Sequence, residues 1–513
     1  MYSLLAFTST TWFLIIILCV MIGLFVLLEN REVNHDECGE GKELDGPVPL
    51  PVIGSLHLLA GYSVPYKAFR ILGNIYGDVF RIKLGSVPCV VVNGLDNIRE
   101  VLMAKGDHFD GRPNFARYNL IFDGDKRNSL AFCDWSELQK TRRELLRIHT
   151  FPQSFSAKFQ QLDKFISSET NSLFEHLSTY DGNPVAFKPL LLHTCANIFM
   201  LHFCSNRFKY GNEQFSQMIR YIDQIFYEVN QGYAGDFMPW MLPFYQKHFN
   251  TIHKWTKEIR KFTMEIVNER YATWQSGRSS ESFDYIDTLI ESIIKEDDKE
   301  MNLEIAMFSL EDIISGHAAI ANFLMKVLAY IAVRPHVQAK IRDEIRKVTK
   351  GSRDVRLSDR RRMPYTEAVI LETIRLIASP IVPHVASQDS SIAGFKVKKG
   401  TMIFLNNYDL NYGPELWENP EQFSPERFLS KEGLLVKPDH FFPFSTGRRS
   451  CMGYKMVQYL SFSITALILQ KYQIEPVKGL SYDVPIGDLA LPYETYKFRF
   501  RPRHYRKLKH HHS

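Results

Sequence analysis

The stretch FSTGRRSCMGYKM, residues 444–456, places a cysteine beside two arginines and between two glycines. Cys451 precedes an apolar run that predicts a helix, and a thiolate at a helix N-terminus has a lowered pKa because free backbone N–H groups stabilise it. Arg448 and Arg449 add positive charge, and the glycines let a large flat group approach the backbone closely. A thiolate, arginines that pair with carboxylates and a flat apolar partner suit haem iron with cysteine as the axial ligand.

Three other roles for Cys451 compete with haem ligation. A buried structural cysteine needs no flanking arginines. A zinc site needs further Cys or His residues at ligand spacing, and none lies nearby in the sequence. A nucleophilic cysteine needs a histidine partner, which the sequence alone does not identify. Haem ligation accounts for more of the stretch than these alternatives.

The same stretch resembles the haem-binding loop of the cytochrome P450 family, F-x-x-G-x-R-x-C-x-G, at Phe444, Gly447, Arg449, Cys451 and Gly453. The resemblance implies that these residues bind haem b, iron protoporphyrin IX, with Cys451 as the metal ligand. It implies the cytochrome P450 fold for a haem-thiolate catalytic domain. In that family the thiolate pushes electron density onto the iron and favours O–O cleavage.

Two more motifs of the family follow in the expected order. LETIRL contains Glu372 and Arg375, which match its ExxR helix pair, and SPERF contains Arg427, which matches the arginine that completes a Glu-Arg-Arg triad. A surface i,i+3 ion pair contributes only about 0.2–0.5 kcal/mol, so ExxR alone is a weak signal. These motifs, together with an uncharged N-terminal segment at 11–28 and a proline-rich segment at 45–55, extend the resemblance from about residue 11 to 503.

Some haem contacts of the family are only partly kept. The family usually has W-x-x-x-R on an early helix, where the arginine grips a haem propionate. Here Trp135 is followed four residues later by the neutral Gln139, which puts this contact in doubt. His384 stands where the family often offers a propionate donor, and a buried, hydrogen-bonded histidine is the alternative.

The stretch EDIISGHAAIAN, residues 311–322, departs from the family pattern. The long central helix of the family carries [AG]-G-x-[DE]-T, in which an acid and a threonine relay protons to dioxygen. Gly316 is retained here, but Ala318 and Ala319 occupy the acid and alcohol positions. General-acid help is worth about 10²–10⁴-fold, so the loss matters chemically. Either a water chain, His317, Asn322 or a substrate hydroxyl supplies protons, or the reaction needs none.

The remaining sequence predicts a mainly α protein with a small β part. Helical periodicity dominates from about 135 to 350, and the longest predicted helix runs from Leu303 to Val333, closed by Arg334-Pro335. Segments 78–94 and 394–407 alternate around glycine turns, so each predicts a β-hairpin. Shorter helices are predicted at 64–76, from Pro364 to about Ile377, and after Cys451.

The N-terminal region predicts a membrane anchor. Residues 11–28 carry no charge, and a helix of this length crosses most of a ~30 Å hydrocarbon core. A cleaved signal peptide is less consistent, because no Lys or Arg precedes the run and no small-x-small site follows it. Three prolines in 45–55 predict a rigid hinge. The catalytic domain then spans 56–503, and a basic, His-containing tail, 504–513, receives no function.

Charge and cysteine usage restrict the partners and the compartment. A net charge of +5, spread along the chain, lacks the clustered basic footprint of a nucleic-acid binder. Seven cysteines without a CxxC pair suit a reducing compartment. The resemblance implies the endoplasmic reticulum membrane, with a cytosolic catalytic domain, and electrons from NADPH through NADPH-cytochrome P450 reductase. Basic residues that suit such an acidic partner are Lys140, Arg142, Arg143, Arg147 and Lys455.

The alanine pair, with CDWSELQKTRREL (133–145) and NIREVLMAKGDHFDGRPNF (97–115), resembles one arthropod branch of the family, the Spook and Spookier proteins of ecdysteroid synthesis. That resemblance implies an early oxidation of a sterol, 7-dehydrocholesterol, toward a ketodiol. Segments 114–122 and 233–249 suit a bulky apolar ligand or the bilayer. Two other functions stay open: a reductase-independent haem-thiolate isomerase or dehydratase, and a non-catalytic haem-dependent sterol-binding protein.

Overall fold

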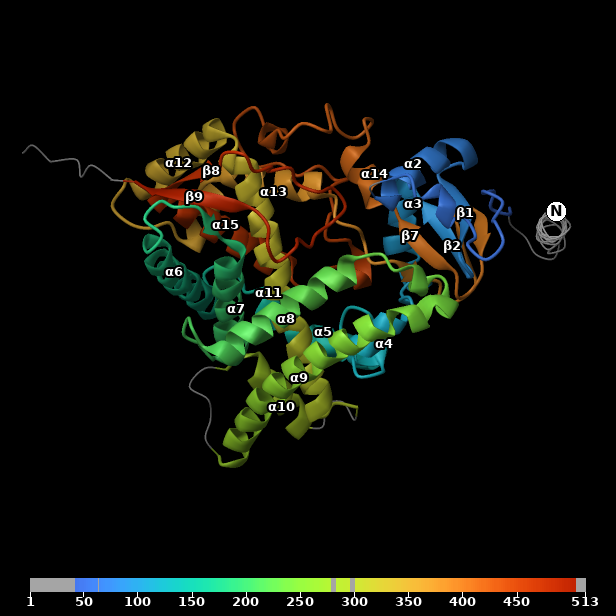
Figure 1. Cartoon of the computed structure of the whole chain (residues 1–513), viewed down its shortest axis with the longest axis horizontal. Coiled ribbons are helices and arrows are strands. Elements are labelled where there is room, and N and C mark those ends of the chain that lie inside the picture. The colour runs from blue at the N-terminus through green and yellow to red at the C-terminus, as the bar shows by residue number, and fades with distance from the viewer. Residues whose placement is uncertain (1–41, 63, 278–282, 296–299, 504–513) are drawn as a thin grey trace, which may run out of the picture. The chain divides into compact units, whose positions relative to one another are not determined.

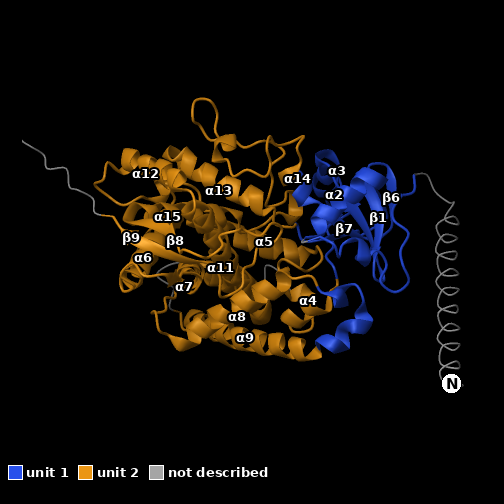
Figure 2. Cartoon of the chain, turned by 45° about the horizontal axis from the view of Figure 1, so that its top comes forward, with its two compact units in different colours: residues 1–113, 233–245, 381–410 blue, residues 114–232, 246–380, 411–513 orange. Residues whose placement is uncertain are grey.

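The computed structural model describes residues 42–62, 64–277, 283–295 and 300–503. The predicted membrane helix at 11–28 and the histidines at 510–512 lie outside the described residues. The chain forms two compact units (Figure 2). Unit 1 comprises residues up to 113, 233–245 and 381–410, and unit 2 comprises 114–232, 246–380 and 411–513. Helices dominate and strands are few, as predicted.

Unit 1 is built on a four-stranded sheet in the order β1-β2-β7-β4, with a separate β5-β6 pair. The predicted hairpin at 78–94 is confirmed, because β1 and β2 pair antiparallel from Val79↔Val92 to Leu84↔Val87. The strands are β1 Val79–Leu84, β2 Val87–Val92, β4 His384–Val385, β5 Ser390–Ile392, β6 Phe395–Val397 and β7 Met402–Leu405. Its helices are α2 Pro65–Tyr76, α3 Leu95–Arg99, η1 Leu56–Leu58, η2 Glu100–Ala104, η4 Ala234–Asp236 and η5 Pro239–Tyr245.

The predicted hairpin at 394–407 is wrong. Its first strand, β6, pairs with β5, whereas its second, β7, lies parallel to β2 and antiparallel to β4. The sequence contains two alternating runs and a Gly400 turn, but the alternation does not specify which strands pair. One partner of β7 is β2, which lies over 300 residues earlier in the chain. The local pattern therefore identified the two strands but not the strands with which they pair.

The proline-rich segment 45–55 follows β1. Arg81 N donates to Asp45 O at 2.8 Å, and Ser55 N donates to Lys83 O at 2.6 Å. A Cβ on Gly46 would lie 2.0 Å from Arg81 O, so only glycine permits this approach. Within unit 1 the segment is thus attached to β1 at both of its ends.

Unit 2 is helical apart from a three-stranded sheet in the order β3-β9-β8. The strands are β3 Val185–Ala186, β8 Tyr472–Pro476 and β9 Lys497–Pro502. The helices are α4 Ala116–Ile121, α5 Glu137–Thr150, α6 Ala157–Ser178, α7 Lys188–Cys204, α8 Glu213–Asn230, α9 Gln246–Gln275, α10 Tyr285–Ile294, α11 Leu303–Ala332, α12 Pro335–Thr349, α13 Pro364–Ile377 and α15 Tyr454–Lys471. Short 3₁₀ turns are η3 Lys126–Asn128, η6 Leu357–Arg362, η7 Pro425–Phe428 and η8 Gly447–Arg449, and α14 Asn407–Tyr412 spans the boundary of the units.

The helix α11 is the core element of unit 2. Its Asn302 N-cap accepts a hydrogen bond from Ile305 N at 2.9 Å, and Pro335 opens the next helix, so both ends carry the expected signals. It packs against α7, α8, α9 and α15 (Figure 1). Within the described residues it alone is long and apolar enough to cross a membrane, but most of it is buried in the protein. Its apolar surface therefore belongs to the core.

Candidate active site

Cys451 lies in a short loop between η8 and α15. Its backbone N donates to Phe444 O at 3.0 Å, which closes the loop. Cys451 is exposed, whereas Cys89, Cys133, Cys195 and Cys204 are buried. Protein nevertheless crowds around its sulfur: burial raises the thiol pKa, while the N–H groups of Gly453 and Tyr454 and the Arg143 guanidinium lower it. The predicted net lowering is wrong for the protein alone, because desolvation exceeds the help from the helix start.

Two arginines connect the cysteine loop to neighbouring segments of unit 2. Arg143, on α5, donates from Nη2 to Ser450 O at 2.7 Å. Burial lowers the Arg143 pKa to about 10, which leaves the side chain charged at neutral pH. Arg449 is buried and donates from Nη2 to the Cys133 carbonyl. Positive charge is thus fixed directly beside the thiol, as a ligand with carboxylate groups requires.

Trp135 lies against the cysteine loop. The guanidinium carbons of Arg448 and Arg449 lie 5.2 and 5.6 Å from its ring centroid. Gln139, one turn further on, is buried and donates to the Leu130 carbonyl, so its amide nitrogen is already engaged by the protein. Sequence reasoning placed Arg143 only in a surface patch. The signal it missed is that Arg143 lies one helical turn beyond Gln139, on the same face of α5.

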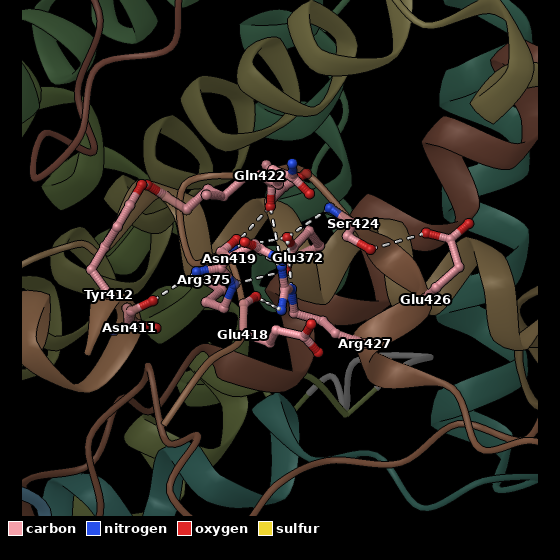
Figure 3. A network of polar contacts seen from close by, with 12 residues as sticks. Glu372, Arg375, Asn411, Tyr412, Glu418, Asn419, Gln422, Ser424, Glu426 and Arg427 are labelled. Carbon is pink, nitrogen blue, oxygen red and sulfur yellow. Dashed lines mark hydrogen bonds and ion pairs between the residues drawn. The ribbon is translucent and has the colours of Figure 1, made fainter. Parts of the chain in front are cut away.

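Glu372, Arg375 and Arg427 meet in one buried network (Figure 3). Arg375 donates to both carboxylate oxygens of Glu372, at 2.8 and 2.9 Å, and Arg427 Nε donates to Glu372 Oε1 at 3.1 Å. Backbone groups complete it: Ser424 N donates to Glu372 at 2.9 Å, and Arg375 donates to Asn411 O at 2.7 Å. The network therefore attaches the irregular segment 411–427 to α13.

The residues predicted on α11 separate into two faces. Ser315, Gly316 and Ala319 are partly exposed, whereas His317 and Ala318 are buried. His317 Nδ1 bonds to Ile314 O at 2.7 Å, and burial lowers its pKa to about 4, so the ring is neutral at physiological pH. A Cβ on Gly316 would lie 3.3 Å from the Phe199 ring, which explains why a glycine suits this position.

Asn322 is engaged entirely by protein. Its Nδ2 donates to Asp223 Oδ1 and to Ala318 O, each at 2.8 Å, and its Oδ1 accepts from Leu491 N at 2.8 Å. Asp223 is itself paired with buried Lys188 at 2.7 Å. These contacts join α7, α8, α11 and the segment before β9, so the geometry gives Asn322 a structural role.

His384 belongs to unit 1, where it begins β4. It is buried, and its Nδ1 bonds to Phe109 O at 2.5 Å. Strand β4 pairs with β7, with His384 opposite Ile403. The ring orientation is therefore set within unit 1.

The residues of unit 2 fit a haem with an axial thiolate. An exposed cysteine, two backbone N–H groups that lower its thiol pKa and fixed arginines match the donor set of such a site. No group of three or more His, Cys, Asp or Glu side chains that could hold a metal ion comes together within the described residues. Of the cysteines described in unit 2, Cys451 is exposed and Cys133, Cys195 and Cys204 are buried, so Cys451 is the one that suits an axial ligand.

Comparison with known proteins agrees with this geometry. The cytochrome P450 family model matches residues 44–500. Cytochrome P450 307a1 of Drosophila melanogaster is 38% identical over 500 residues, which cover 92% of both chains. Farnesoate epoxidase of Bombyx mori is 29% identical, with 89% of this chain and 93% of that protein covered, and human cytochrome P450 1A1 is 29% identical, with 88% and 90% covered. The chain belongs to the cytochrome P450 family of haem-thiolate monooxygenases.

Proposed function

We propose that the protein is a membrane-bound monooxygenase that oxidises a sterol in an early step of ecdysteroid synthesis, from 7-dehydrocholesterol toward the ketodiol. The observation that carries this proposal is the Ala318–Ala319 pair on α11, which the chain shares by resemblance with the Spook and Spookier branch. The similarity to an insect cytochrome P450 along 92% of the chain supports it. The similarity to farnesoate epoxidase of Bombyx mori, whose name gives an apolar substrate, supports an apolar substrate here.

In this proposal Cys451 would ligate haem b, and Phe444, Gly447 and Gly453 shape the loop that would hold it. Bound haem supplies the redox-active iron at which dioxygen is activated. The residues of unit 2 that would hold its carboxylates are Arg449 and Trp135. Gly316 leaves room for the Phe199 ring against α11. The buried rings of Tyr118 and Phe122, which lie beside Phe132, support an apolar substrate wall in unit 2.

Electrons come from NADPH through a reductase that docks on a positive surface of unit 2. Lys140 and Arg147 are exposed on α5, and Lys455 is half-buried at the start of α15. The predicted patch needs one correction, because Arg142 is fully buried and donates from Nε to Ser309 Oγ at 2.9 Å. The docking surface therefore has fewer cations than the sequence suggested.

The proposed location is the endoplasmic reticulum membrane, with residues 11–28 as a single anchor and the catalytic domain in the cytosol. The described chain adds an exposed apolar segment, η5, in which Trp240 is 57% exposed and Phe244 is 78% exposed. Exposed aromatic side chains of this size favour the membrane interface over water. Within unit 1, Ser86 N donates to Phe237 O at 3.0 Å and attaches the segment to the β1–β2 turn.

A reductase-independent isomerase or dehydratase is the second candidate, and the same alanine pair favours it. Its reaction consumes no dioxygen, so it needs no proton relay. The deciding experiment measures turnover of a Δ7-sterol with and without NADPH and reductase, under labelled dioxygen. We expect labelled product only with NADPH and reductase. Unlabelled product without NADPH would replace the monooxygenase proposal with the isomerase.

A further inference from the structure

One face of α11 stands out from the rest of this helix. From Ala306 to Ala329 every residue is buried except four, which are partly exposed: Asp312, Ser315, Gly316 and Ala319. The spacing i, i+3, i+4, i+7 places these four on a single stripe of the helix. Between Ala306 and Ala329, the stripe is therefore the part of α11 that its neighbours leave partly uncovered. It contains one carboxyl group and one hydroxyl group.

The carboxyl group of Asp312 is held in a fixed position. Its Oδ2 accepts a hydrogen bond from Leu130 N and another from Ser129 Oγ at 3.2 Å. Its Oδ1 makes no hydrogen bond to any part of the chain that the structure describes. One carboxylate oxygen is thus fixed by the protein, and the other remains accessible at the partly exposed stripe.

A short segment connects Asp312 to the thiolate loop. Residues 129 and 130 bind Asp312, and Cys133, three residues further on, accepts a hydrogen bond from Arg449, two residues before Cys451. The segment 129–133 therefore links the stripe of α11 to the loop that contains Cys451. The alternatives raised by the sequence are turned away from it, because His317 is buried and the amide of Asn322 is fully engaged.

Monooxygenation consumes protons: RH + O₂ + NADPH + H⁺ gives ROH + H₂O + NADP⁺. Alanines 318 and 319 provide none. We propose that Asp312 and Ser315 form the acid–alcohol pair that delivers protons in this enzyme, displaced along α11 toward its N-terminus. This inference rests on the monooxygenase function proposed above. Asp312 releases a proton from Oδ1 to water or to the Ser315 hydroxyl. The group that accepts this proton passes a proton on along the stripe, and solvent then reprotonates the carboxylate.

The electrostatics of the site suit this role. Burial raises the Asp312 pKa to about 6, although the hydrogen bond from Leu130, the Arg142 charge and the Ser129 hydroxyl all lower it. A general acid works best when its pKa lies near the operating pH. The other titratable groups that act on or neighbour this carboxyl are Arg142 on α5, Tyr285 on α10, Cys133 and Glu311.

The test compares full-length, haem-loaded Asp312→Asn, Asp312→Glu and Ser315→Ala with wild type. Glu304→Gln, an exposed acid in the first turn of α11, is the matched control. We expect Asp312→Asn to lower product formation by about 10²-fold, with NADPH diverted to peroxide. Asp312→Glu should restore part of the loss, and Ser315→Ala should shift electrons to peroxide in the same direction. Glu304→Gln should behave as wild type.

Infrared titration gives a readout that needs no turnover. A carboxyl C=O band should titrate with a midpoint near pH 6 in wild type and be absent in Asp312→Asn. If the sterol proposal fails, wild type forms no product, yet the infrared band and the substrate-free peroxide yields still decide the role of Asp312. Unchanged product and peroxide ratios in Asp312→Asn would overturn the proposal. It would also be overturned if Glu311→Gln, and not Asp312→Asn, lost product and released peroxide. If Asp312→Asn does not fold, unchanged coupling in Ser315→Ala overturns it.

Discussion

Arg375 and Glu372 form a two-pronged ion pair on α13, with N–O distances of 2.8 and 2.9 Å, and neither side chain has exposed surface. The same i,i+3 spacing occurs on α12, where Arg346 pairs with Asp343 at 2.9 Å but the side chains are 72% and 56% exposed. Identical spacing therefore gives two different interactions, and burial decides which one is structurally important.

Replacing one partner of the buried pair should be far more costly than replacing one of the exposed pair. Arg375→Ala leaves the Glu372 carboxylate without its main partner, and breaking a buried ion pair costs about 3–5 kcal/mol. Arg346→Ala should change the free energy of unfolding by less than about 0.5 kcal/mol. The measurements are haem content and denaturant midpoint. Normal haem loading in Arg375→Ala would show that the network is dispensable.

The Cys451 assignment predicts a spectral change. The reduced carbon monoxide complex should absorb at the long-wavelength Soret position of thiolate ligation, and Cys451→His should lose that band. Cys195→Ala, at a fully buried thiol away from the loop, is the control and should retain it. A Cys451→His protein with an unchanged band would assign the ligand elsewhere.

Membrane association should depend partly on η5. A protein lacking residues 1–30 should still partition in part to vesicles, because Trp240 and Phe244 are exposed. Replacing both with Glu should lower the bound fraction. Leu434→Glu, at an equally exposed apolar residue in unit 2, should have little effect. Equal partitioning of the shortened protein and its double variant would remove η5 from the interface.

One buried lysine should make the free energy of unfolding increase with pH. Lys326, on α11, has no exposed surface and donates to the Asp488 carbonyl, and burial lowers its pKa to about 7 from 10.5. Between these values the unfolded chain binds more protons at this site than the folded one, so the free energy of unfolding increases with pH by up to about 1.4 kcal/mol per unit.

The measurement is the denaturant midpoint from pH 7 to 9.5. Wild type and the exposed-lysine control Lys347→Met should both gain stability relative to Lys326→Met over this range. Parallel curves for all three proteins would mean that Lys326 keeps an ordinary pKa in the folded state.

Sequence pattern predicted the elements better than their partners. The helix from Pro364 to Ile377 and the long helix from Leu303 are observed with those starts, since proline and an Asn cap mark them locally. Two properties depend on distant residues and left no local signal. One is the pairing of β7 with β2, and the other is the burial that engages Asn322 and opens the stripe containing Asp312. Tertiary burial, more than spacing, decides which polar residues face the site.

The Ala319 position gives a test of how the relay was replaced. Ala319 lies on the open stripe, so Ala319→Thr adds a hydroxyl to the same space as Ser315. If an alternative proton path already works, the new hydroxyl should not raise the ratio of product to NADPH. It should instead lower turnover, because it disturbs both the water path and an apolar substrate wall.

His317→Ala should reduce stability by about 1–3 kcal/mol through loss of a buried side chain, without raising peroxide. Labelled dioxygen, with peroxide followed for each variant, distinguishes the outcomes. A large gain in coupling for Ala319→Thr would show that the enzyme lacks an efficient proton path, and peroxide release from His317→Ala would return the relay to histidine. No label in the product of any variant would exclude the monooxygenase and leave the isomerase.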